Sequence, residues 1–300
     1  MTRRILHATL AVLLASCAGV RHPWPEETKC ELSGPDATAS GYEKWVKLLL
    51  RGYDPESRKV TSPALDCTTS QVRWEAPAFA CFDNALATTV LPPRPLGEAD
   101  VIVSRIGEGF GIAWVITNRF ASGDALGPVA VVEQKEDRLL VHALGALRAY
   151  PEHTTLRLEK LGDLTVLVAE GQLCASKDPA TCVRSARVMP LRGDRFSPEP
   201  LFSEAGACAS PAWFDLDRRE SATLDTGWTR RNTLAASLVF GPQGLRVEEQ
   251  LVVQDLDPKD KQARPRLFRK ADGERTVKAV EAKLVTTGRS VWVTVVSADR

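Results

Sequence analysis

The stretch TTLRLEKLGDLTVLVAEG, residues 154–171, decides the fold class. Leu156 and Leu158 alternate with charged residues, and the period of two resumes at Leu164 after a turn at 161–163. Such alternation, interrupted by Gly and Asp, is typical of two strands joined by a short turn. The stretch therefore predicts a β-hairpin with one apolar face.

Similar runs continue through the rest of the chain, with Gly- and Pro-containing connections and few segments that resemble crossover helices. Strands joined by short turns pair antiparallel, so we predict a mainly β fold with an antiparallel body. A sandwich and a barrel remain open, and a propeller is less favoured because no repeat has a fixed period. The predicted strands are 100–106, 110–117, 128–133, 138–143, 155–160, 164–170, 185–191, 235–240, 245–254, 277–286 and 290–297.

One N-terminal amphipathic helix is predicted before the strands. Ser40 and Glu43 have the spacing of a capping box, and Gly52 stands where a residue following the helix is expected. Four large apolar side chains fall at i, i+3, i+4 and i+7, which places them on one face that we expect to pack on the sheet. These side chains are Tyr42, Trp45, Val46 and Leu49.

The N-terminus has the features of an export signal. Arg3 and Arg4 precede an apolar segment at 5–14, which is too short to span a bilayer. The residues LASC at 14–17 follow, and they resemble the lipobox of bacterial lipoproteins. This resemblance implies cleavage before Cys17 and lipid attached to that cysteine. An ordinary secretory signal without lipid is the alternative.

The resemblance covers the first 17 residues only, and it sets the expected domain organisation. We predict a signal peptide at 1–16, a lipidated tether at 17–39 that is rich in Pro, Gly, Glu and Thr, and one β-rich domain at 40–300 that could comprise two sub-domains. Ala18 follows the cysteine, and the sorting rule of enteric bacteria then implies the outer membrane.

Composition is that of a folded globular protein, with 44% hydrophobic and 26% charged residues. Removal of Arg3 and Arg4 with the signal changes 39 basic against 38 acidic residues to 37 against 38, a net charge of −1. This balance argues against nucleic acid as a partner. It leaves the membrane, reached through lipid on Cys17, and an envelope protein or lipid as the expected partners.

The six remaining cysteines form an even set, which in an oxidising envelope predicts three disulfides. The turn-prone segment ASKDPAT separates two of them, which favours a local pair. The predicted pairs are Cys174–Cys182, Cys67–Cys81 and Cys30–Cys208. The cysteines form no C-x-x-C pair and no histidine lies near them in sequence, so we predict no metal and no cofactor.

Short motifs with possible chemistry have simpler interpretations. The glycines of 107–111 lie between two predicted strands and favour a hairpin turn over a dinucleotide loop. The three aspartates of 255–260 lack the ligand number that calcium needs and favour a solvated turn. Residues 192–194 spell Arg-Gly-Asp, which we interpret as a polar turn. The basic residues of 257–278 are interspersed with acids and favour a solvated loop.

The histidines bear on possible catalysis. His142 alternates with apolar neighbours, which predicts an exposed side chain, and His153 lies in a predicted turn. We therefore predict no catalytic residues and a non-catalytic binding or scaffolding role for an envelope lipoprotein. The alternatives are a carrier of a lipid or other apolar molecule, and a hydrolase that uses His142 or His153.

Overall fold

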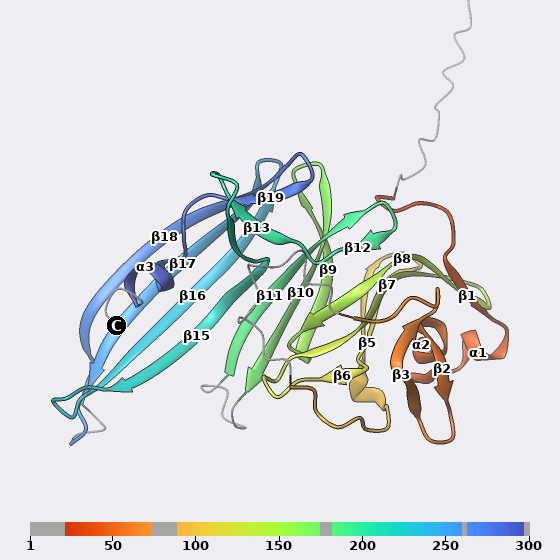
Figure 1. The fold of residues 1–300 in the computed structure, drawn as a ribbon, viewed down its shortest axis with the longest axis horizontal. Coiled ribbons are helices and arrows are strands. Elements are labelled where there is room, and N and C mark those ends of the chain that lie inside the picture. The colour runs from red at the N-terminus through yellow and green to blue at the C-terminus, as the bar shows by residue number, and fades with distance from the viewer. Residues whose placement is uncertain (1–21, 74–88, 175–181, 260–262, 297–300) are drawn as a thin grey trace, which may run out of the picture.

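The computed structural model describes residues 22–73, 89–174, 182–259 and 263–296. The predicted antiparallel β body is confirmed: 17 strands of the described residues form one hydrogen-bonded network, and β2–β3 forms a separate hairpin. The network consists of two sheets that lie side by side in Figure 1. The predicted hairpin at 154–171 is confirmed as β9 (Glu152–Leu161) and β10 (Leu164–Cys174).

The first sheet is centred on β7 and β8. Two short strands, β1 and β12, both pair with the side of β8 that faces away from β7. The short β6 (Asn118–Arg119) pairs with the beginning of β7. The strands in order are β4 (Val101–Gly107), β5 (Phe110–Val115), β7 (Ala125–Lys135) and β8 (Arg138–Ala149), followed by β1 (Cys30–Ser33) and β12 (Arg195–Phe196).

The second sheet begins at β9 and curves along four long strands, β15 to β18 (Figure 1). Its far side is completed by a parallel pairing of β19 with β13. After β9 and β10, the strands in order are β11 (Cys182–Arg192), β15 (Trp213–Thr223), β16 (Thr229–Gly241), β17 (Gly244–Leu256), β18 (Arg266–Val280), β19 (Lys283–Thr286), β13 (Pro200–Ser203) and β14 (Cys208–Pro211).

The main core lies between the two sheets, because β7 and β8 have almost continuous apolar runs that require cover on both faces. Side chains from these strands pack against β9, β10 and β11, with Trp114 fully buried. The opposite face of the first sheet is covered by α1 (Pro35–Thr38), α2 (Glu43–Leu49), and the hairpin of β2 (Leu50–Asp54) and β3 (Lys59–Asp66).

Helix α2 lies within the segment where the sequence predicts a helix, and it buries Val46 and Leu49. The predicted capping box is wrong, because Tyr42 occupies the N-cap position and no side chain caps the helix. Gly52 does not end the helix either. The chain passes directly into β2, where Gly52 adopts a φ of 69° opposite Thr61.

The predicted strand at 290–297 is wrong, because residues 291–295 form helix α3 (Val291–Val295). The helix packs into the trough formed by the curved sheet, against β17 and β18 (Figure 1). Buried Glu249 accepts a hydrogen bond from the Val291 backbone nitrogen at 2.8 Å, and Ser290 caps the Trp292 nitrogen. Packing and these two acceptors outweigh the strand preference of β-branched residues. The predicted strand 277–286 is likewise two strands, since the chain turns at Glu281 between β18 and β19.

Candidate functional site

The first described residues dock on the body through aromatic contacts. Trp24 is 8% exposed and belongs to the core between the sheets. Its ring stacks on His22 at 4.9 Å and lies 5.3 Å from Phe110, measured between ring centroids. Such aromatic contacts contribute about 0.5–1.5 kcal/mol each beyond the area they bury. The chain is therefore attached to the body within five residues of Cys17.

Polar contacts continue this attachment up to Cys30. The Lys29 backbone nitrogen donates to the Val141 carbonyl at 2.7 Å, and the Lys29 ammonium lies 2.7 Å from Asp194. The hydrogen bond from Lys29 lowers the pKa of Asp194. Residues 22–39 thus lie on the body, whereas the sequence predicted this range as part of a tether that lifts the body off the membrane. Because the segment is rich in Pro and Gly, its sequence does not indicate the strand β1 that lies within it.

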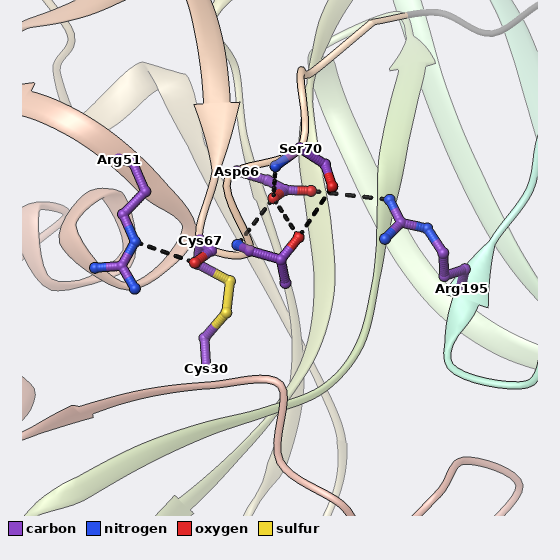
Figure 2. Close-up of a disulfide and its surroundings, with 7 residues drawn as sticks. Cys30, Arg51, Asp66, Cys67, Ser70 and Arg195 are labelled. Atoms are coloured by element: carbon purple, nitrogen blue, oxygen red, sulfur yellow. Dashed lines mark hydrogen bonds and ion pairs between the residues drawn. A yellow bond between two sulfur atoms is a disulfide. The ribbon is translucent and has the colours of Figure 1, made fainter.

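A disulfide between Cys30 and Cys67 fixes the end of this segment (Figure 2). The Cys67 carbonyl accepts a hydrogen bond from Arg51 at 3.0 Å. Asp66, next in the chain, accepts hydrogen bonds from the backbone nitrogens of Thr68 and Ser70 and closes a tight turn. The covalent link therefore joins β1 to the turn that follows β3, which the Asp66 side chain closes.

The turn between β11 and β12 reaches across from the second sheet to the same place. It is the polar turn predicted at 192–194, with Gly193 at a φ of 61°. Asp194 pairs with Lys29, and Arg195 lies 3.8 Å from Asp66 (Figure 2). This turn consequently holds the N-terminal segment to the body, a structural role that the sequence does not indicate.

The disulfide predictions are partly correct. Cys174 and Cys182 are bonded as predicted, at facing positions of β10 and β11. The predicted pairs Cys67–Cys81 and Cys30–Cys208 are wrong, because Cys30 and Cys67 bond to each other. Their Cα atoms lie 6.1 Å apart, since α2 and β2 fold β3 back beside β1. Cys208 is also disulfide-bonded, while Cys17 and Cys81 lie outside the described residues.

The expected exposure of His142 is wrong: the residue is 5% exposed. Its Nε2 lies 2.9 Å from a Glu133 carboxylate oxygen on the neighbouring strand, and its ring lies 6.0 Å from Phe110. Burial of Glu133 opposes ionisation, but hydrogen bonds from Lys135 and His142 outweigh it and lower the pKa of this carboxyl. Both faces of β8 are buried, so the alternation of polar and apolar residues along this strand does not indicate which side chains are exposed.

A cleft of about 680 Å³ opens where the edge strands β4 and β9 of the two sheets meet. Arg94 and Arg119 line it, and each donates through Nη2 to the same oxygen of Asp100, at 2.6 and 2.7 Å. Asp100 is buried and also accepts from the Gly97 nitrogen at 3.0 Å. His153 lines the cleft from β9, in a left-handed conformation with a φ of 48°. The cleft is thus lined by two guanidinium groups, one imidazole and the carboxylate of Glu152, while the buried Asp100 carboxylate pairs with both guanidinium groups.

Sequence reasoning missed Arg94, Asp100 and Arg119. They are separated by up to 25 residues in surface loops and short elements, and no spacing rule connects them. The hairpin predicted at 107–111 is confirmed, with Gly109 at a φ of 75° in the turn between β4 and β5. In the part of the chain that the structure describes, no three His, Cys, Asp or Glu side chains are grouped to hold a metal ion.

No family model matches this chain, and no curated protein or solved structure is significantly similar to it. None of the helices in the described ranges has the length and apolar character needed to cross a membrane.

Proposed function

We propose that this chain is an exported lipoprotein of a bacterial outer membrane, anchored through lipid on Cys17, whose β body binds a ligand or partner without catalysis. The residues LASC at 14–17, which follow a short apolar segment and resemble a lipobox, support this proposal most strongly, and Trp24 docks on the body seven residues after Cys17. A segment of five residues spans at most about 17 Å, so lipid on Cys17 would keep the body beside the bilayer. Two or more acyl chains would make this attachment stable.

The disulfides support an oxidising compartment. Cys174–Cys182 joins the paired strands β10 and β11, and Cys30–Cys67 joins β1 to the turn after β3, where it closes the attachment of the N-terminal segment. Structural disulfides persist in the envelope, whereas the reducing cytosol disfavours them. Export and the lipobox resemblance thus agree with the covalent structure of the body.

A non-catalytic role is supported by the positions of the histidines. His22 stacks on Trp24, and His142 is buried against Glu133, out of reach of a substrate. His153 lies in the cleft, where the neighbouring charges suit binding. For the carrier alternative, the concave face that such a carrier would use is occupied by α3. We therefore favour binding in the cleft over transport in the trough.

The intact mass of detergent-extracted protein tests this proposal, with thiols alkylated before and after reduction. We expect a chain that begins at Cys17, carries acyl mass and has no thiol accessible until reduction. The variant Cys17→Ser is the matched control, which should lack the acyl mass and leave the membrane fraction. A wild-type chain that begins at Met1 or Thr2 and has free thiols would overturn the proposal.

A further inference from the structure

The floor of the cleft carries one uncompensated positive charge. Arg94 and Arg119 share the single carboxylate of Asp100, so two guanidinium charges meet one negative charge. Each guanidinium uses Nη2 for this contact, and Arg119 Nη2 also donates to the Ala99 carbonyl at 3.3 Å; the Arg119 Nε is buried and has no hydrogen-bond partner among the described residues. A guanidinium presents five donors in a planar fork that suits a carboxylate. The floor therefore matches one further anionic group with a single charge.

The walls of the cleft are largely apolar. Val101 and Ile102 contribute from the beginning of β4, and Pro151 contributes from the segment before β9. Glu152 also lines the cleft and offsets the excess positive charge of the floor, but it is exposed, so water screens its charge more than that of buried Asp100. Pockets of a few hundred Å³ with mostly apolar walls and a few convergent polar groups are typical of small-molecule sites.

From this charge and lining we infer that the cleft at the meeting edges of β4 and β9 binds a small organic acid with one carboxylate and an apolar body. Arg94 and Arg119 hold the carboxylate above Asp100. The apolar body of the ligand lies against Val101 and Ile102, and His153 closes the site from the β9 side. This inference rests on the proposed binding role but not on the lipid anchor.

Isothermal titration of the full chain in detergent tests the inference with two probes of equal shape, 3-phenylpropanoate and 3-phenylpropanamide. We expect saturable binding of one molecule of the acid per chain and at least tenfold weaker binding of the uncharged amide. Arg94→Met should remove this preference, because Arg94 supplies part of the fork. Its side chain is 54% exposed, so the variant should fold.

A second variant keeps the test valid if Arg94→Met fails to fold. Ala99→Asp places a carboxylate beside the two guanidiniums at an exposed position, and we expect it to abolish binding of the acid while the far-ultraviolet circular dichroism stays unchanged. Leu267→Ala, on the far strand β18, should bind like the wild type. Equal affinity of the wild type for acid and amide, or full binding by both cleft variants, would overturn the inference. The mass of the N-terminus is unaffected by either result, so failure of the anchor is detected separately.

Discussion

Replacement of Trp24 by alanine tests how the chain is attached to its body. The indole is 8% exposed and lies in the core between the two sheets, against His22 and Phe110. Removing a buried tryptophan side chain costs about 3–5 kcal/mol. We expect about 3 kcal/mol here, the lower end of this range, because a terminal segment can move away instead of maintaining a cavity.

The same change should lengthen the connection to the membrane. In the wild type, five residues separate Cys17 from the docked His22, which limits the reach to about 17 Å. When the segment from His22 to Lys29 opens, the chain is next held by the disulfide at Cys30, which is 13 residues from Cys17. The reach of the body then rises to about 45 Å.

Treatment of the lipidated protein in vesicles with a lysine-specific endoproteinase measures this opening, because trypsin would also cut after Arg21, ahead of the docked segment. Cleavage after Lys29 releases the body, and the site is protected while the segment stays docked. A loss of about 3 kcal/mol raises the open population by about 100-fold, and the release rate should rise accordingly. Leu267→Ala, whose side chain is 60% exposed, is the control and should change neither release nor urea unfolding. An unchanged cleavage rate at Lys29, with a stability change below about 1 kcal/mol, would refute this account of the docking.

Three further changes test the packing. Gly127→Ala forces its Cβ into the last carbonyl of β5, and urea denaturation should show a loss of about 1–3 kcal/mol or more. Glu249→Leu leaves its partner Arg275 uncompensated and should cost about 3–5 kcal/mol; a second change, Arg275→Met, should restore part of this loss, because the Val291 nitrogen still lacks its acceptor. The pKa of Glu133 is lowered on folding because hydrogen bonds from Lys135 and His142 outweigh its burial. The stability advantage over Glu133→Gln should therefore be full above the ordinary pKa of 4.5 and vanish as the pH falls through the lower folded-state value, as thermal melts across that range would show.

The fold class could be predicted because the strands of the body have a buried and an exposed face. In β17, Leu245 and Val247 alternate with exposed residues, and this period is visible in the sequence. The strand β15 was missed because its inward face changes from Phe214 and Leu216 to Arg218, which makes contact with Trp292 instead of an apolar neighbour. Alternation fails as a signal where the buried face is itself charged.

Helix α3 and the cleft both depend on contacts between residues that are distant in the sequence, and local patterns do not show such contacts. The run Val291–Val296 has strand propensity, and it becomes helical because Glu249, more than 40 residues earlier, accepts the first backbone nitrogen of the helix. Likewise Arg94, Asp100 and Arg119 become one site only when the loop before β4 folds beside β6. Contacts between distant residues that follow no period are set by the tertiary fold.

The order of the N-terminal attachments has a consequence for an anchored protein. From Cys17 onward the chain meets the aromatic contacts of Trp24, then the ion pair and strand pairing around Lys29, and then the disulfide at Cys30. The contacts become harder to break along the chain, because the last one is covalent. A force on the lipid proposed at Cys17 would therefore release the docked segment first and leave the Cys30–Cys67 disulfide unbroken. The body could then lie at most about 17 Å from Cys17 while the aromatic contacts hold, and at most about 45 Å from it once only the disulfide holds.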